Sequence, residues 1–450
     1  MTALTEVGTR ADSRSTRDDA ALRRATLRRV SYRLLPFLAL LYICNYIDRT
    51  NVGIASLQMN RDLHFSAGAY GFGAGIFFIG YGAFEIPSNL ILARVGARRW
   101  IARIMITWGV LATGMMFVRT PLSFYVLRFL LGAAEAGFFP GVVYYLTSWF
   151  PAEERARAVS RFMLGVPVAS MISGTLAGPL LGLQGTLGLA GWQWLFLLEG
   201  LPTIVLGVVV LGYLTESPEQ AQWLTVPQRE WLVRCLRLER ARHAQSTARD
   251  FRQALRNRKV WQLGLIWSLM FASSNAYAFW APQVLKGLFS ARGSGWVGMM
   301  LATIAFVGGV GLLTNGAHSD WRCERRQHVG VPFVFGTIGW LLAASALSPV
   351  ATLCGLGMAS ASVMSIFGPF WCIPSQFLTG DAAAGGLALV SSLGALGAFA
   401  GPNILGVAQQ LSGSQRGGFA FLGCLTALAA TLSFRLPGIG AVDQSVQLDA

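Results

Sequence analysis

The stretch LSFYVLRFLLGAAEAGFFPGVVYYLTSWF, residues 122–150, decides the fold class because it is long and apolar yet carries two charges. About 20 mainly apolar residues cross a bilayer, so this stretch is long enough to span a membrane as a helix. Arg128 and Glu135 lie well inside it. Their separation is close to two helical turns, which predicts both side chains on one face, about 10 Å apart along the axis.

A charge at membrane depth costs several kcal/mol unless it faces protein, an opposite charge or a water-filled cavity. Arg128 and Glu135 therefore predict a functional pair that lines a polar cavity. The alternative is a structural ion pair that ties two helices together.

The composition of the whole chain agrees with a membrane protein. Of its 450 residues, 54% are hydrophobic and 13% are charged, whereas a soluble domain has about 25% charged residues. Its apolar segments are continuous runs rather than short alternating strands, which favours helices over a barrel. The net charge of +15 does not indicate nucleic-acid binding, because the arginines lie between apolar runs, where they set membrane topology. The prediction is an all-α polytopic protein embedded in the lipid bilayer.

Twelve apolar runs are expected to cross the membrane as two groups of six. They lie near 34–56, 68–92, 101–118, 121–149, 158–182, 192–214, 260–284, 296–317, 329–347, 350–374, 384–408 and 417–435. This predicts a disordered cytoplasmic tail (1–33), a six-helix bundle (34–214), a cytoplasmic linker (215–259), a second six-helix bundle (260–436) and a C-terminal tail (437–450). Within the linker, Trp and Leu recur at helical spacing beside many charges, which predicts an amphipathic helix on the membrane surface.

Arginine placement predicts the orientation. The N-terminal tail and alternate loops are rich in arginine, and the remaining loops carry only single charges. Positive loops stay on the cytoplasmic side, so both termini of this multi-pass inner-membrane protein are expected in the cytoplasm. We also expect the protein to act as a monomer.

The two groups of six spans look like copies of each other. Pro140 is followed by Pro151 at the end of the fourth span, and Pro369 is followed by Gly380 at the same spacing in the second group. Parallel halves of this kind build transporters that rock about a central site.

Further candidate site residues lie in the first two spans. Asp48 and Arg49 interrupt the first span beside Tyr46, and adjacent side chains point about 100° apart, so they need not pair with each other. We interpret them as cavity residues, with an interfacial charge pair as the alternative. Tyr81 either offers its hydroxyl to a bound anion or packs between helices. Glu85 is expected to pair with cytoplasmic arginines.

Trp371 lies between Pro369 and Pro374, where a broken helix could expose it to a cavity, and core packing is equally consistent with its position. No phosphate-cradling GxxxxGK[ST] motif, HExxH motif or nucleophile elbow occurs in a suitable context. The six cysteines and four histidines lack metal-ligand spacing. Neither a cofactor nor enzymatic activity is therefore expected.

At several motifs the sequence resembles the major facilitator superfamily and, within it, the anion:cation symporter family, over roughly residues 30–436. The motifs are NYIDRTNVGIA (45–55), IPSNLILARVGARRWIAR (86–103), RFLLGAAEAGFFPGVVYYLTSWFP (128–151), GWQWLFLLEGLP (191–202), ESPEQAQWL (216–224) and GPFWCIPSQFLTG (368–380). The resemblance implies a carrier of organic anions such as sugar acids, tartrate and aromatic acids.

The resemblance also implies roles for single residues. Arg49 would bind the substrate carboxylate, and Arg128 would serve binding or coupling. Asp48 and Glu135 would be the protonation sites. Three aromatic residues would line the cavity: Tyr46, Tyr81 and Trp371.

The eleventh span departs from the family pattern. Where members often have Asn-Ser, this chain has Ser391 and Ser392, and a second amide is also replaced. Ser391 remains a candidate substrate contact, but the lost amides remove hydrogen bonds that a sugar acid would use. This favours a less hydroxylated or aromatic acid.

The function expected from the sequence is secondary active transport, with proton-coupled symport of a small organic anion by alternating access. An anion exchanger or a sodium-coupled carrier of the same fold is the alternative. A membrane enzyme or a non-transporting sensor would need a nucleophile, a metal set or a signalling domain, and the sequence shows none.

Overall fold

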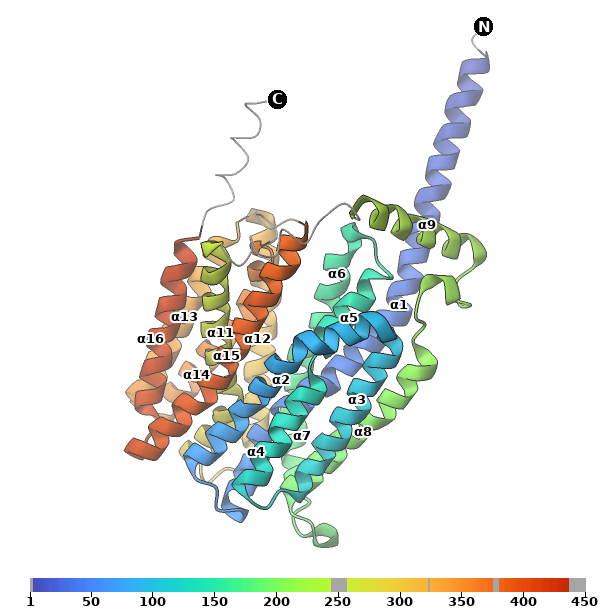
Figure 1. The fold of residues 1–450 in the computed structure, drawn as a ribbon. Coiled ribbons are helices and arrows are strands. Elements are labelled where there is room, and N and C mark those ends of the chain that lie inside the picture. The colour runs from blue at the N-terminus through green and yellow to red at the C-terminus, as the bar shows by residue number, and fades with distance from the viewer. Residues whose placement is uncertain (1–2, 244–256, 323, 375–379, 437–450) are drawn as a thin grey trace.

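A computed structural model describes residues 3–243, 257–322, 324–374 and 380–436 as a bundle of long helices (Figure 1). Every regular element within these residues is helical. The first group comprises α1 (Ala3–Asp62), α2 (Ala67–Val95), α3 (Ala97–Gly114), η1 (Met115–Phe117), α4 (Pro121–Glu135), α5 (Phe138–Thr147), α6 (Ala152–Met163), α7 (Gly165–Leu181), η2 (Thr186–Gly188), α8 (Gly191–Tyr213), η3 (Pro218–Gln220) and α9 (Val226–His243). The second comprises α11 (Arg258–Leu288), α12 (Ser294–Arg322), α13 (Arg326–Ser345), α14 (Pro349–Trp371), α15 (Gly380–Ser412) and α16 (Arg416–Phe434).

Eleven segments of the described chain are long and apolar enough to cross a membrane. The expected span at 260–284 lies in α11, which is long enough at 31 residues but more polar than the other spans. Much of α11 is buried, and it packs against α15, α14 and α1. Polar residues at membrane depth are tolerated where they face protein instead of lipid. The eleven segments and α11 together give the twelve transmembrane helices.

The expected span over 121–149 is confirmed as one membrane-crossing segment, Pro121–Thr147, but its helix is interrupted in the middle. α4 ends at Glu135 and α5 begins at Phe138. Between them, Gly137 has φ +87°, and a Cβ there would lie 2.3 Å from the Ser88 side-chain oxygen. Only glycine adopts this conformation at little cost. The break therefore leaves the Glu135 carboxylate at the end of a helix.

The prediction of a disordered N-terminal tail is wrong, because α1 begins at Ala3 and continues without interruption into the first span. Thr26 and Val30 are already buried against the rest of the protein. Runs of Ala, Leu and Arg have high helix propensity, so the helix extends beyond the bundle.

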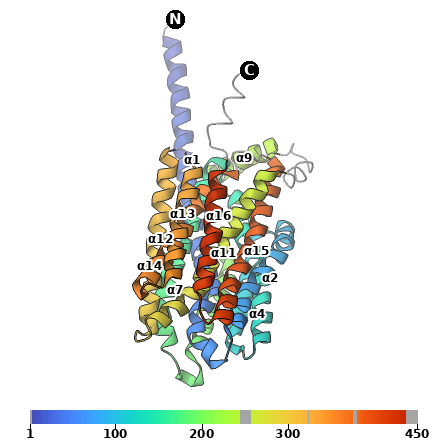
Figure 2. The same cartoon turned by 90° about the vertical axis from the view of Figure 1, so that its left-hand side faces the viewer.

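α9 confirms a helix in the expected linker, and it packs against α1. Leu232 and Leu236 on α9 are buried, and Trp223 before it stacks on Trp149 at a centroid distance of 5.3 Å. Residues 244–256 of the linker and the tail 437–450 lie outside the described residues. The N-terminal part of α1, α9 and the end of α16 lie at the same end of the molecule (Figures 1 and 2).

The two groups of helices pack closely against each other at positions where glycine residues allow the backbones to approach. α2 packs against α15, and α7 packs against α12. A Cβ at Gly71 would lie 2.8 Å from the Pro402 carbonyl oxygen, and one at Gly174 would lie 2.6 Å from the Gly298 carbonyl oxygen. Such close backbone approach is typical of helix pairs in membranes. These two seams hold the halves together on either side of α1 and α11.

Candidate functional site

Arg49 and Glu135 form an ion pair between α1 and α4. Arg49 Nε donates a hydrogen bond to Glu135 Oε1 at 2.9 Å, and a second guanidinium nitrogen contacts the same oxygen. The Glu135 side chain is fully buried, and that of Arg49 is 17% exposed. The negative end of the α4 dipole disfavours a carboxylate at this position, so Arg49 supplies the compensating charge. The other Glu135 oxygen is buried without a hydrogen-bond partner in the described structure.

Aromatic rings cover the Arg49 guanidinium. Its central carbon lies 5.1 Å from the Tyr81 ring centroid and 5.5 Å from that of Phe77. Cation–π contacts of this kind stabilise a guanidinium in surroundings that lack water. The predicted site residues Arg49, Glu135 and Tyr81 are therefore brought together.

Arg128 is buried on its own, without a carboxylate within ion-pair distance among the described residues. It donates hydrogen bonds to the backbone oxygens of Gly73 and Ala74 on α2, at 3.3 and 3.1 Å. Phe77 and Phe279 lie against its guanidinium, with ring centroids 4.7 and 5.6 Å away. Arg128 and Glu135 therefore do not pair with each other, and the ion pair that connects two helices is the one between Glu135 and Arg49.

Asp48 occupies a different face of α1 from Arg49. Its Oδ2 accepts hydrogen bonds from Trp108 Nε1 on α3 and from Thr203 Oγ1 on α8, each at 2.8 Å. The adjacent Asp48 and Arg49 therefore do not pair with each other. α1 carries one polar face toward α4 and a second toward α3 and α8.

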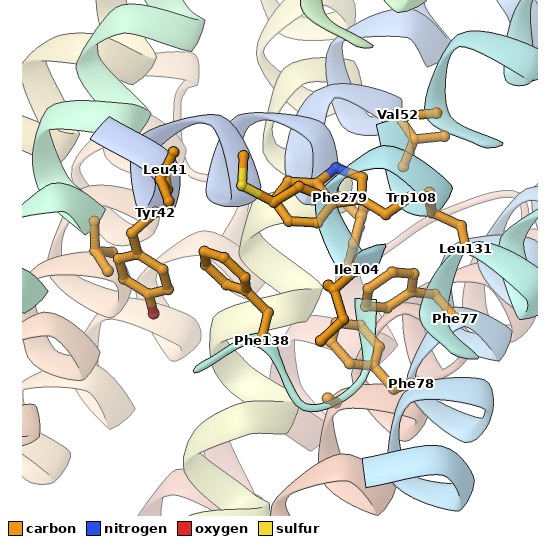
Figure 3. Close-up of a cluster of buried hydrophobic side chains, with 14 of the residues drawn as sticks. Leu41, Tyr42, Val52, Phe77, Phe78, Ile104, Trp108, Leu131, Phe138 and Phe279 are labelled. Atoms are coloured by element: carbon orange, nitrogen blue, oxygen red, sulfur yellow. The ribbon is translucent and has the colours of Figure 1, made fainter. Parts of the chain in front are cut away.

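Large apolar side chains surround both polar faces. Figure 3 shows Trp108, Phe138, Phe77 and Phe279 gathered around this part of the bundle. The Trp108 and Phe138 rings meet edge to face, with centroids 5.2 Å apart. This packing keeps the local dielectric constant low, so charges placed here interact strongly.

A small cavity of about 70 Å³ lies between the two halves. Hydroxyl side chains line much of it, drawn from both halves: Tyr46, Thr50, Ser170, Ser173, Ser274, Tyr277 and Ser360. Tyr46 of α1 faces Ser170, and Tyr277 of α11 faces Ser360. The space is large enough for several water molecules. Neither Arg49 nor Glu135 lines the cavity, but Arg49 acts electrostatically on Tyr46, which does, so the ion pair lies near the cavity.

Trp371 and Ser391 lie in the second half, and neither lines this cavity. Trp371 ends α14 and packs edge-on against Trp267, with ring centroids 4.7 Å apart. Ser391 is half-buried on α15. Glu85 forms no ion pair with a loop arginine in the described structure, and Arg49 is the basic group that acts on it. The expected pairing of Glu85 with cytoplasmic arginines is therefore wrong.

Sequence reasoning missed two groups of residues. Ser274 and Tyr277 line the cavity from α11, and the polar run SSNAY within an apolar helix was the available signal. Glu199 is a buried acid in the middle of α8. It interrupts the apolar run LFLLEGLP in the same way that Glu135 interrupts its own span.

Known proteins share both the sequence and the fold. The family model described as Major Facilitator Superfamily matches residues 38–402. A protein of Agrobacterium vitis named "Putative tartrate transporter" is 42% identical over 412 residues, which cover 91% of each chain. The "Putative metabolite transport protein NicT" of Pseudomonas putida is 42% identical and covers 92% of this chain and 95% of its own.

A solved structure of the xylose transporter XylE from E. coli, in an inward open conformation, matches with a TM-score of 0.73. It is 14% identical in sequence and covers 92% of this chain and 98% of its own. At this identity the likeness concerns the fold. Together with the sequence relatives, it establishes a membrane-spanning transporter and not an enzyme. The chain belongs to the major facilitator superfamily.

Proposed function

We propose that this transporter carries a small organic anion together with protons across the bacterial inner membrane. The single observation that supports this most is the buried Arg49–Glu135 ion pair beside a hydroxyl-lined cavity between the halves. A guanidinium is the preferred partner of a carboxylate, because its planar fork donates two parallel hydrogen bonds.

In the proposed mechanism, the substrate carboxylate and Glu135 compete for Arg49. While Glu135 is ionised it occupies the guanidinium, and an incoming anion would add a second negative charge in a low-dielectric site. A proton on Glu135 removes that charge and frees Arg49 for the substrate. Proton binding and anion binding thus favour each other, which is the condition for symport.

The substrate class rests on the relatives and on the residues that border the cavity. One relative is named as a tartrate transporter. The cavity supplies hydroxyl donors, while Ser391 on α15 replaces the amide that sugar-acid carriers often have. We propose a small carboxylate with few hydroxyl groups, or an aromatic acid. Trp371 and Ser391 would approach it when the halves change their relative angle.

We further propose that both termini face the cytoplasm and that residues 34–214 and 260–436 rock against each other. The N-terminal part of α1 and the end of α16 lie at one end of the molecule (Figure 1), where the arginine-rich loops are also expected. A monomer is sufficient for this mechanism, because one chain supplies both walls of the cavity.

Uptake into proteoliposomes tests the proposal. Labelled tartrate and an aromatic acid are offered with an imposed pH gradient, with a sodium gradient, or with unlabelled substrate inside. Accumulation driven by the pH gradient is expected. Accumulation that follows only sodium, or counterflow with no response to either gradient, would replace symport with the sodium-coupled or exchange mechanism.

The variant Glu135→Gln links the uptake assay to the ion pair. Glutamine is neutral like a protonated glutamate, so counterflow should persist while accumulation driven by the pH gradient falls. Glu154→Gln is a matched control, because Glu154 lies outside the bundle core, near Arg157 and Arg23. An unchanged pH-driven accumulation in Glu135→Gln would contradict the role given to Glu135.

A further inference from the structure

A second polar compartment lies between α1, α3 and α8, away from the cavity. Asn45, Asp48 and Asn51 are spaced three residues apart on α1, so they share one face of that helix. All three side chains are at most 1% exposed. α3 and α8 close the compartment, because Trp108 and Thr203 both donate hydrogen bonds to Asp48.

Glu199 faces the same compartment from α8. It lies one turn before Thr203, so both point toward α1. Glu199 is 8% exposed, and neither of its carboxylate oxygens has a hydrogen-bond partner in the described structure. The Asn51 amide faces it, and the amide nitrogen is without a partner as well. Asp48 acts electrostatically on Glu199, so the two carboxyl groups are neighbours.

The compartment contains more polar atoms than the protein satisfies. Among the described residues on the α1, α3 and α8 walls of this compartment, seven buried atoms lack a partner: Asn45 Oδ1 and Nδ2, Asp48 Oδ1, Asn51 Nδ2, Thr113 Oγ1, and Glu199 Oε1 and Oε2. Each such atom costs about 1–3 kcal/mol when it stays unpaired. A ligand that supplies positive charge and hydrogen bonds therefore belongs here.

The charges identify that ligand. No lysine or arginine of the described chain lies within ion-pair distance of Asp48 or Glu199, and Arg49 is engaged by Glu135 on the other face of α1. Around Glu199, α1 contributes Asp48 and the Cys44 thiol. Glu135 on α4 acts electrostatically on Asp48, and its negative charge further disfavours a second ionised carboxylate. α7 carries no charged residue, and the arginines of α3 lie in its first two turns. Two neighbouring carboxylates without a counter-charge cannot both stay ionised in a low-dielectric interior.

We propose that Glu199 and Asp48 form a proton-binding site separate from the Arg49–Glu135 pair, with the proton carried on Glu199. Asp48 is the better anion, because two donors already stabilise its Oδ2. One proton from water forms one O–H bond on Glu199 and changes the charge of the pair from −2 to −1, and its release to water reverses the step. The proposal rests on the proposed symport and adds a second coupled proton to it.

The test is the proton stoichiometry of the full-length protein in proteoliposomes. Each coupled proton contributes about a tenfold accumulation of substrate per pH unit of gradient. Glu199→Gln should keep counterflow and lower the limiting accumulation ratio about tenfold per pH unit. The double variant Asp48→Asn/Glu199→Gln should have the same limiting accumulation ratio as Glu199→Gln alone, because both residues bind the same proton. An unchanged ratio in Glu199→Gln would overturn the proposal.

A spectroscopic measurement separates this proposal from the transport mechanism. Infrared difference spectra between acid and alkaline pH should show a protonated carboxyl band that disappears in Glu199→Gln and persists in the control Glu154→Gln. If the wild type fails to accumulate substrate but this band is present, the symport proposal fails while the proton site stands. The proton site would be overturned if Glu199→Gln left the band intact. It would also be overturned if a sodium gradient alone drove accumulation in the wild type and Glu199→Gln abolished that accumulation.

Discussion

At the scale of single residues, two adjacent charged residues of α1, Asp48 and Arg49, belong to two different polar sites. Arg49 contacts Glu135 on α4, and Asp48 contacts Trp108 and Thr203 on α3 and α8. The sequence revealed both charges, because ionised residues inside an apolar run are conspicuous. It could not assign their partners, since these come from helices that lie far along the chain.

Replacing Arg49 by lysine should reduce substrate uptake by more than about tenfold. An ammonium group is a point charge and does not reproduce the planar fork that Glu135 and a carboxylate substrate share. Uptake and substrate affinity are measured in proteoliposomes, with Arg157→Lys, an exposed arginine, as the control. Wild-type affinity in Arg49→Lys would mean that the guanidinium geometry is not used.

Thr203→Val should lower the free energy of unfolding by about 1–3 kcal/mol. The two side chains have the same shape, but valine leaves Asp48 Oδ2 with one donor instead of two. The measurement is unfolding in detergent by a thermal or denaturant titration. Thr175→Val, an exposed threonine that bonds only within α7, should change stability by less.

At the scale of elements, glycine decides how closely α2 and α4 approach. A Cβ at Gly132 would lie 1.9 Å from the Phe77 backbone oxygen, and one at Gly80 would lie 2.3 Å from that of Phe129. This contact places Arg128 against the α2 carbonyls and Glu135 near α1. Abundant glycine in the spans predicted close packing, but not which pairs of helices meet.

Gly132→Ala should therefore destabilise the protein, because backbone atoms have no room to move away from the new methyl group. Gly114→Ala is the matched control: nothing lies within 4 Å of its Cβ position, and alanine favours a helix by up to about 1 kcal/mol. Thermal unfolding should show a lower midpoint for Gly132→Ala alone. Equal midpoints for the two variants would contradict the close α2–α4 contact.

The element scale also shows where sequence patterns mislead. The run 122–150 is uniformly apolar around its charges, so its interruption at Gly137 carries no signal in hydropathy. The N-terminal tail has few apolar residues, yet α1 extends through it. α11 shows the opposite effect: it is a membrane span although it is more polar than the others, because much of it is buried between other helices.

At the scale of the whole molecule, composition and arginine placement were sufficient to predict twelve helices in two halves. The candidate site was predicted only in its first-half residues. The second half contributes hydroxyl groups such as Ser274 and Tyr277, which are common in membrane helices and give no charge signal. Their role depends on how the halves pack, and no local pattern encodes that arrangement.

The seam between the halves yields a test of rocking. A Cβ at Gly298 on α12 would lie 2.1 Å from the Gly174 backbone oxygen on α7. Gly298→Val should disfavour the present arrangement of the halves and reduce transport about tenfold or more. Gly316→Val on the same helix has open space and is the control. The two variants are compared by uptake and by cysteine accessibility in the cavity, and wild-type values for Gly298→Val would contradict a closely packed seam.

The interruption after Glu135 forms a hinge between α4 and α5 in this transmembrane segment. The Ala136 N–H donates to the Gly132 carbonyl oxygen, and the next helical hydrogen bond runs from the Gly141 N–H to the Gly137 carbonyl oxygen. α5 can therefore change its angle to α4 without breaking hydrogen bonds within either helix. The carboxylate sits immediately beside that hinge. In the proposed mechanism, gain or loss of one proton on Glu135 changes the charge at the point where the segment bends most easily, which links proton binding to helix movement.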